Sequence, residues 1–263
     1  MAQTDQQSPV SLNGQIITGD EPVLMAGERG FTLGDGVFDT MLVIDGEMQD
    51  MNTHFDRLLR HYAILICPQA PRTYTPPLDA GTLKTRAQAL IAAQTTTANR
   101  IVLRTSLSNG PGGRGLTAPD PPTPTCLMSM TPAPPPGDTT PVKAIVATYV
   151  RRNEHSPLSQ IKSLNYGDQL IAHREALARG AGEAVLLNTQ GRIACTTVGN
   201  IILVENGQWL TPPQSEGAMD GTKRAALLNE GVHEDHITQE RLYSAEAVYA
   251  CNSVRGIQIL RMI

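Results

Sequence analysis

Apolar residues in the first half of the chain follow two spacings. In THFDRLLRHYAIL, 53–65, they fall at positions 55, 58, 59, 62 and 65, the spacing of an amphipathic helix. Thr53 is suited to cap that helix, and a second helix is expected over about 79–97. Apolar runs at 23–27, 37–46, 47–51, 100–108 and 126–130 predict strands. The dipeptide Asp45-Gly46 predicts a hairpin turn between two of them.

The second half alternates strand and helix patterns. Strands are expected at 142–150, 184–188, 193–205 and 208–213, and two more within 245–263. A helix is expected from Tyr166 to Arg179, with Gly180 as its C-cap, and another begins near Asp220. The sequence therefore predicts α+β or α/β architecture in two lobes.

A proline-rich segment, TPAPPPGDTTP at 131–141, separates the two halves. Proline removes a backbone donor and fixes φ, so this segment cannot continue a helix or a sheet. We expect a small N-terminal lobe over 1–130, this linker, and a larger C-terminal lobe over 142–263.

Composition narrows the function classes. The 263 residues carry a net charge of −4 without a basic block, which argues against nucleic acid as a partner. No apolar run is long enough to cross a membrane, and the first residues lack the pattern of a signal peptide. The four cysteines are scattered without a CxxC pair, which is typical of reduced thiols in a cytoplasmic protein.

One of only four lysines, Lys162, stands where an extended segment gives way to a helix. Burial lowers the pKa of a lysine amine and makes it a nucleophile suited to Schiff-base chemistry. The common alternative is a solvated surface residue, because lysine is seldom buried.

Six segments in chain order carry a family resemblance: ERGFTLGDGVFDT, HFDRLLR, GPGGRGL, IKSLNYGDQLIAHREALARGAGEAVLLNTQGRI, LTPP and NSVRGI. Together they resemble the class IV (fold type IV) pyridoxal-phosphate (PLP) enzymes over roughly 14–262. That family contains branched-chain and D-amino-acid aminotransferases and aminodeoxychorismate lyase. The resemblance implies PLP in a cleft between a small and a large lobe, and a homodimer whose active site uses both subunits.

The resemblance also implies residue roles. Lys162 matches the catalytic lysine that forms the Schiff base and carries the proton, and Arg57 matches the phosphate-binding arginine. From the residues alone, Arg57 could equally form a surface ion pair with Asp56 or Glu47. The further cofactor-binding candidates are Tyr166, Cys195, Asn200, Gly221, Thr222, Lys223, Asn252 and Ser253. The substrate-binding candidates are Phe38, Arg104, Asn109 and Arg114.

Alternatives remain for several of these positions. A helix start at Gly221 can bind phosphate through its free N–H groups and dipole, although most such starts are plain caps. Tyr166 could be a core tyrosine. His233 and His236 are spaced loosely like metal ligands, but a solvated surface is the better interpretation, and no metal is expected.

Three positions depart from the family pattern. Cys195 replaces a glutamate that pairs with the pyridine nitrogen of PLP, and a thiol with a pKa of about 8.5 pairs poorly with a cation. Lys223 replaces a threonine at the phosphate helix, and Asn109 replaces an arginine of the substrate loop. Substrate carboxylate recognition would then depend on Arg114 or Arg104.

Local motifs favour one branch of the family. GGRGL at 112–116 and CNSVRGI at 251–257 favour a lyase that eliminates pyruvate from aminodeoxychorismate and leaves 4-aminobenzoate. The alternatives are an aminotransferase for branched-chain or D-amino acids, and a PLP-binding protein whose catalysis is weak or lost because of Cys195.

Overall fold

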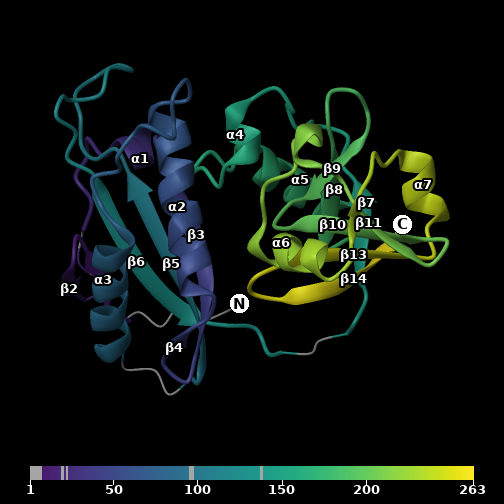
Figure 1. Ribbon diagram of the computed structural model, residues 1–263, viewed down its shortest axis with the longest axis horizontal. Helices are drawn as coiled ribbons and strands as arrows, with labels where there is room; N and C mark the ends of the chain where they lie inside the picture. The colour runs from purple at the N-terminus through teal and green to yellow at the C-terminus, as the bar shows by residue number, and fades with distance from the viewer. Residues whose placement is uncertain (1–7, 19–20, 22, 95–97, 137–138) are drawn as a thin grey trace. The chain divides into compact units, whose positions relative to one another are not determined.

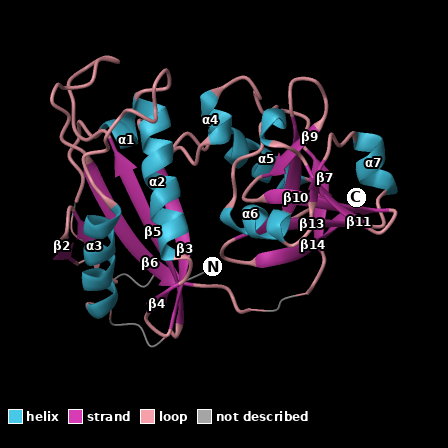
Figure 2. Cartoon of the chain, viewed as in Figure 1, coloured by secondary structure: helices cyan, strands magenta, loops and turns pink. Residues whose placement is uncertain are grey.

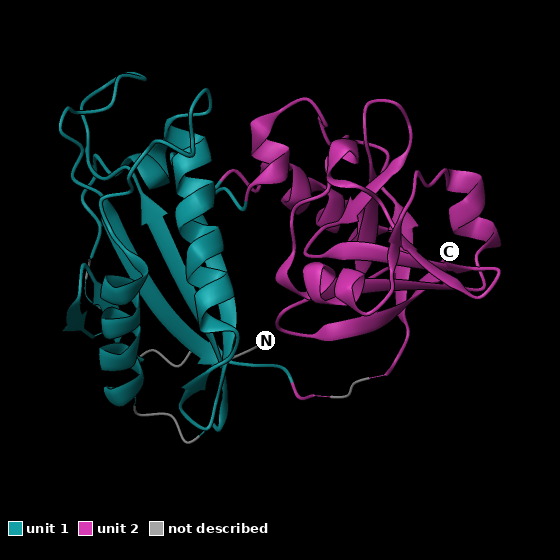
Figure 3. Ribbon diagram, viewed as in Figure 1, with its two compact units in different colours: residues 1–134, 162–164 teal, residues 135–161, 165–263 magenta. Residues whose placement is uncertain are grey.

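The structure is a computed structural model that describes residues 8–18, 21, 23–94, 98–136 and 139–263 (Figure 1). The chain divides into two compact units (Figure 3). Unit 1 contains 1–134 and Lys162–Leu164, and unit 2 contains 135–161 and 165–263. The sequence placed Lys162 in the C-terminal lobe, whereas its contacts group it with unit 1. Parts of the predicted linker (137–138) and of the predicted second helix (95–97) lie outside the described residues.

Unit 1 is a six-stranded sheet, ordered β2-β1-β6-β5-β3-β4, with the two longer helices, α2 and α3, on one face (Figure 2). Every pair of neighbouring strands in it is antiparallel. Its strands are β1 (Val10–Leu12), β2 (Gln15–Ile17), β3 (Gly36–Ile44), β4 (Glu47–Met48), β5 (Arg100–Ser108) and β6 (Thr125–Pro132). Its helices are α1 (Arg29–Thr32), α2 (Met51–Ile66) and α3 (Ala80–Ala92).

Helix α2 buries the apolar stripe that the sequence spacing predicts. Phe55, Leu58 and Tyr62 are each fully buried. The helix starts at Met51 after Asp50, whose φ is 49°, so Thr53 lies inside the helix and the predicted cap is wrong. The strand predicted at 47–51 is only the two residues of β4, because α2 begins at Met51, before the predicted start at Thr53. The strand predicted at 23–27 is not formed. The predicted hairpin is confirmed, with Asp45 and Gly46 at φ 49° and 84°.

Unit 2 is an eight-stranded mixed sheet, ordered β12-β11-β10-β13-β14-β7-β8-β9. Its strands are β7 (Val142–Val146), β8 (Glu183–Leu187), β9 (Ile193–Thr196), β10 (Asn200–Glu205), β11 (Gln208–Thr211), β12 (His233–Glu234), β13 (Ala247–Asn252) and β14 (Gly256–Met262). Its helices are α4 (Pro157–Gln160), α5 (Gly167–Ala178), the short 3-10 helix η1 (Gln214–Glu216), α6 (Thr222–Asn229) and α7 (Gln239–Ser244).

Strand β8 is buried along its whole length, which explains its continuous apolar run. On one face Leu186 packs in a cluster with Ala172 and Ala176 of α5. On the other face Leu187 joins a second cluster with β10 and β13. The predicted long strand at 193–205 is two strands, because 197–199 forms a tight turn in which the Thr196 N–H donates to the Gly199 carbonyl.

The mixed strands and helices of both units agree with the predicted α+β class. Helix α5 ends at Ala178, and Gly180 adopts φ 73°, as the predicted C-cap requires. All four cysteines are free. Within the described ranges, the helices are too short or too polar to cross a membrane.

Candidate functional site

Strand pairing fixes the position of Lys162. The Phe38 N–H donates to the Lys162 carbonyl at 2.8 Å, and the Leu164 N–H donates to the Gly36 carbonyl at 2.9 Å. The segment Lys162–Leu164 thus extends the sheet beside the first half of β3. Because opposed residues of an antiparallel pair share a face, the side chains of Lys162 and Phe38 emerge together. The Lys162 Nζ lies 4.3 Å from the centroid of the Phe38 ring.

A second cation lies on the same face. In β5, Arg104 is opposite Thr40, two residues from Phe38 in β3. Its guanidinium carbon lies 3.7 Å from the centroid of the Phe38 ring, within the range of a cation–π contact. Phe38, itself a predicted substrate residue, therefore contacts two cations through its buried ring: the lysine predicted to bind the cofactor and the arginine predicted to bind the substrate.

The environment of Lys162 favours its neutral amine. The residue is only 8% exposed. Burial, reinforced by the charges of Arg57 and Arg104 and opposed by Asp39, lowers the pKa of Lys162 to about 8. Such an amine is unprotonated in roughly a tenth of molecules at pH 7, against about one in three thousand for an ordinary lysine. This is the property that a nucleophilic lysine requires.

We predict that acetylation of Lys162 follows this lowered pKa. The labelling rate at Lys162, measured by peptide mass spectrometry across pH, should reach half its maximum near pH 8 in folded protein. In urea-unfolded protein the midpoint should move to about 10.4, the value of a solvated lysine. Equal midpoints in the two states would show that the fold does not perturb this amine.

Arg57 is anchored by a buried carboxylate. Its Nε and Nη2 donate to the two oxygens of Asp39, each at 2.8 Å, and His54 Nδ1 lies 2.7 Å from Asp39 Oδ1. Burial by itself raises the pKa of Asp39, but His54 and Arg57 lower it to about 2. Arg57 is therefore buried in an ion pair with Asp39, whereas the alternative interpretation from the sequence was a surface pair with Asp56 or Glu47.

The sequence reasoning missed three polar residues around this site. Asp39 faces α2 because β3 alternates, and it is the one acid inside the apolar run VFDTMLV. On α2, His54 precedes Arg57 by three residues and His61 follows it by four, so all three lie on one helical face. The Lys162 backbone N–H donates to His61 Nδ1 at 3.0 Å, which ties the lysine segment to α2. The two histidines could have been predicted from their helical spacing relative to Arg57.

The predicted substrate-loop residues have different environments. Asn109 is buried and accepts a hydrogen bond from the Tyr62 hydroxyl at 3.3 Å, while its Nδ2 donates to Asp35 at 3.4 Å. Arg114 is exposed. The loop that carries it is held by Arg29, another residue that the sequence reasoning missed. Besides its ion pair with Asp35, Arg29 donates to three carbonyls of this loop, those of Gly115, Leu116 and Thr117.

Unit 2 gathers several predicted cofactor residues at one end of its sheet. Asn200, at the start of β10, is opposite Cys251 of β13. Its Nδ2 donates to the Met219 carbonyl at 2.8 Å, and a Cβ on Gly221 would lie 2.0 Å from its Oδ1. Only glycine therefore fits immediately before α6. Asn252 Oδ1 accepts from the N–H groups of Val254 and Arg255, which shapes the turn containing Ser253.

The start of helix α6 has features that favour an anion. Thr222 and Lys223 form its first turn, and Gly221 is the capping residue, without a side-chain cap. The exposed N–H groups and the helix dipole at this end favour an anion. Nearby, burial raises the pKa of Cys251 to about 11, against the opposing charges of Lys223 and Arg224.

Two further predicted cofactor residues lie in unit 2. Tyr166 is the N-cap residue of α5. Cys195 lies in β9 opposite Leu186 and is 8% exposed. Burial raises the pKa of the Cys195 thiol, so this side chain carries no negative charge near neutral pH. In unit 1, Lys162 suits an aldehyde and Arg57 a phosphate. In unit 2, the turn at Gly221 also suits a phosphate, whereas Cys195 does not supply the anion that a protonated pyridine ring prefers.

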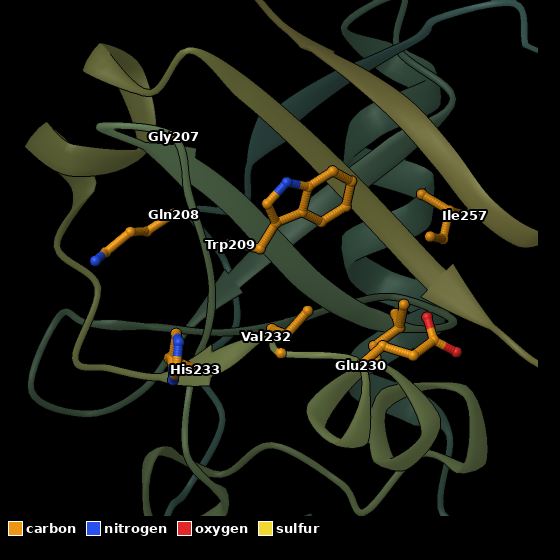
Figure 4. Close-up of a pocket in the computed structure, with 9 residues that line it drawn as sticks. Gly207, Gln208, Trp209, Glu230, Val232, His233 and Ile257 are labelled. Atoms are coloured by element: carbon orange, nitrogen blue, oxygen red, sulfur yellow. The ribbon is translucent and has the colours of Figure 1, made fainter.

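A separate hollow of unit 2 has a different character (Figure 4). Trp209, Val232 and Ile257 line it, with Glu230 and His233 among its polar residues. Trp209 stacks on Tyr249, with ring centroids 5.1 Å apart. None of the predicted site residues lines this hollow.

Comparison with known proteins identifies the family of this chain. The family described as amino-transferase class IV matches residues 36–263. A Methanocaldococcus jannaschii protein assigned by name as a branched-chain-amino-acid aminotransferase is 28% identical over 258 residues, covering 94% of this chain and 85% of the relative.

Solved structures of both branches share the fold. The branched-chain aminotransferase of Thermoproteus uzoniensis superposes with a TM-score of 0.85 at 21% identity, covering 97% of this chain and 87% of that one. The 4-amino-4-deoxychorismate lyase of Pseudomonas aeruginosa gives 0.79 at 25% identity, covering 96% and 90%. The chain is therefore a member of the class IV aminotransferase family, PLP-dependent enzymes of fold type IV.

Proposed function

We propose that this protein is a PLP-dependent lyase that acts on an amino-acid-like carboxylate, eliminating pyruvate from aminodeoxychorismate and leaving 4-aminobenzoate. The observation that carries the proposal is a buried lysine whose pKa is about 8, held beside a second cation on one aromatic ring. When bound, PLP would withdraw electrons from the carbon that loses its proton.

The proposed cofactor-binding roles are given for each unit in turn. In unit 1, Lys162 would bond to the aldehyde carbon, and Arg57, held rigid by Asp39, would bind the phosphate with a fixed guanidinium. In unit 2, the start of α6 with Thr222 and Lys223 would offer N–H groups and charge to a phosphate. Asn200 would shape the Gly221 turn. The other proposed cofactor contacts of unit 2 are Tyr166, Cys195, Asn252 and Ser253.

Proton transfer and substrate binding would use the same face of unit 1. Lys162 would accept the α-proton and return it to the departing group, because an amine with a pKa of about 8 exchanges protons readily near neutral pH. Arg104, against Phe38, would bind the substrate carboxylate, with Arg114 as a second candidate. Buried Asn109 would act by shaping the loop that carries Arg114. We further propose that the protein works as a cytoplasmic homodimer.

A class IV aminotransferase is the second candidate, favoured by the M. jannaschii relative that aligns over nearly the whole chain. The motifs GGRGL and CNSVRGI favour the lyase. Both reactions would begin with the same proton removal by Lys162. They differ afterwards, because an aminotransferase needs a keto-acid acceptor to complete a cycle.

We predict that purified protein with PLP releases pyruvate and 4-aminobenzoate from aminodeoxychorismate without any keto acid. Pyruvate is measured with a coupled dehydrogenase, and 4-aminobenzoate by its fluorescence. Consumption of an amino acid only in the presence of a keto-acid acceptor would replace the lyase by the aminotransferase. Bound PLP with neither reaction would support a cofactor-binding protein that has lost catalysis.

A further inference from the structure

Arg152 differs from the other buried arginines in the groups that face its charge. Within the described ranges four arginines are buried, and three of them face a carboxylate. The ion pairs are Arg29 with Asp35, Arg57 with Asp39, and Arg224 with Glu234. For Arg152, 9% exposed, the described residues place no carboxylate at ion-pairing distance.

Backbone carbonyls bind Arg152 instead. Its Nη2 donates to the Ser159 carbonyl at 2.6 Å, and its Nε donates to the Gly217 carbonyl at 3.4 Å. Carbonyl dipoles satisfy N–H groups but leave a full positive charge uncompensated in a buried place. Retention of such a charge calls for an explanation.

Arg152 and Cys195 both flank strand β8. Arg152 forms an isolated parallel bridge with Asn188, just after the strand, and its N–H donates to the Leu187 carbonyl at 2.8 Å. Cys195 is opposite Leu186 in β9, on the other edge. Burial raises the pKa of the Cys195 thiol, and the charge of Arg152 partly opposes that rise.

Glu183, the acid whose charge also acts on Cys195, has hydrogen-bond partners of its own. Glu183 raises the pKa of the thiol further. Its Oε1 accepts from the Ala184 N–H at 2.8 Å and from the N–H and hydroxyl of Thr197. This carboxylate therefore stabilises the 197–199 turn and forms no ion pair with Arg152.

We propose that Arg152 and Cys195 together keep the pyridine nitrogen of the cofactor unprotonated, which makes Arg152 a residue that determines reaction specificity. The inference rests on the proposed function, because it assumes that the pyridine ring binds at Cys195. A neutral thiol gives a ring proton no anionic partner, and a nearby guanidinium repels it. The ring then withdraws electrons less strongly than in relatives with an acid at this position.

The first test measures the charge in the cofactor-free protein. Cys195→Glu and its neutral match Cys195→Gln are unfolded with denaturant at pH 7. With Arg152 present, we expect the Glu variant to be more stable, with an unfolding equilibrium constant about tenfold smaller. In an Arg152→Gln background the order should reverse, and in Arg152→Lys it should persist. An unchanged Glu-to-Gln ratio across the backgrounds would overturn the proposal.

Should Arg152→Gln fail to fold, the pH dependence of unfolding of Cys195→Glu relative to Cys195→Gln tests the proposal instead. A depressed pKa of the new glutamate keeps its stability advantage above the unfolded value of about 4.3 and loses it only as pH falls through the lower folded value. A raised pKa, under which the Glu variant would lose stability relative to the Gln variant as pH rises from about 4.3 through the higher folded value, would contradict a nearby positive charge.

The second test examines the ring nitrogen through the ¹⁵N chemical shift of ¹⁵N-labelled PLP. We expect an unprotonated nitrogen in the wild-type protein and a protonated one in Cys195→Glu. A protonated nitrogen in the wild type would overturn this proposal alone. Failure of the wild type to bind PLP would overturn the proposed function, and the denaturant experiment, which uses no cofactor, would still report the charge beside residue 195.

Discussion

Replacement of Lys162 by alanine should abolish turnover and the covalent attachment of the cofactor. The amine is buried with a pKa of about 8, so it serves as both nucleophile and proton carrier. Loss of a general acid–base group alone slows a reaction about 10²- to 10⁴-fold, and we expect at least the upper part of that range. In the wild type, borohydride should remove the visible absorption band of bound PLP and leave a label on the peptide containing Lys162.

Two matched variants separate chemistry from folding. Lys162→Arg keeps the positive charge but cannot bond to the aldehyde, so it should be as inactive as Lys162→Ala. Lys84→Ala removes an exposed lysine of α3 and should leave activity unchanged. Lys162→Ala should not lose thermal stability, because it removes a desolvated amine. A borohydride label on another lysine, or normal turnover in Lys162→Ala, would refute the assignment.

The spacing of apolar residues was sufficient to predict the elements that bury only one face. The α2 stripe and the Asp45-Gly46 hairpin follow directly from local spacing, and both are observed. Periodicity failed where tertiary context decides. The 193–205 run reads as one strand because most of its residues are apolar, yet the turn at 197–199 bends it. Glu183, fourteen residues before Thr197, accepts hydrogen bonds from that turn.

The candidate site shows the same division. Lys162 and Arg57 could be proposed from the sequence because motif and burial pattern coincide at each position. Asp39 and Arg152 were missed because their importance depends on pairing, or on its absence, between segments far apart in the chain. No local pattern tells whether a buried arginine will meet a carboxylate or only carbonyl groups. The departure at Cys195 was visible in the sequence, but the nearby cation that gives it a physical consequence was not.

Replacement of Arg57 by methionine should strongly destabilise the fold. Arg57 contributes two charge-assisted hydrogen bonds to Asp39, and its loss leaves that buried carboxylate without its guanidinium partner. Breaking one side of a buried pair costs about 3–5 kcal/mol. The free energy of unfolding, measured with urea, should fall by about this amount. A change below about 1 kcal/mol would mean that the pair behaves like an exposed ion pair.

The double variant Asp39→Asn/Arg57→Met isolates the phosphate role of Arg57. Removing both charges should restore most of the lost stability, because no uncompensated carboxylate remains. Compared with Asp39→Asn alone, the double variant should bind PLP about 10- to 100-fold more weakly, the loss expected for a hydrogen bond to a charged group. Pyridoxal, which lacks the phosphate, should bind both variants equally. An equal loss for pyridoxal would show that Arg57 acts through the structure of unit 1, whereas a loss confined to PLP would show that its guanidinium binds the phosphate.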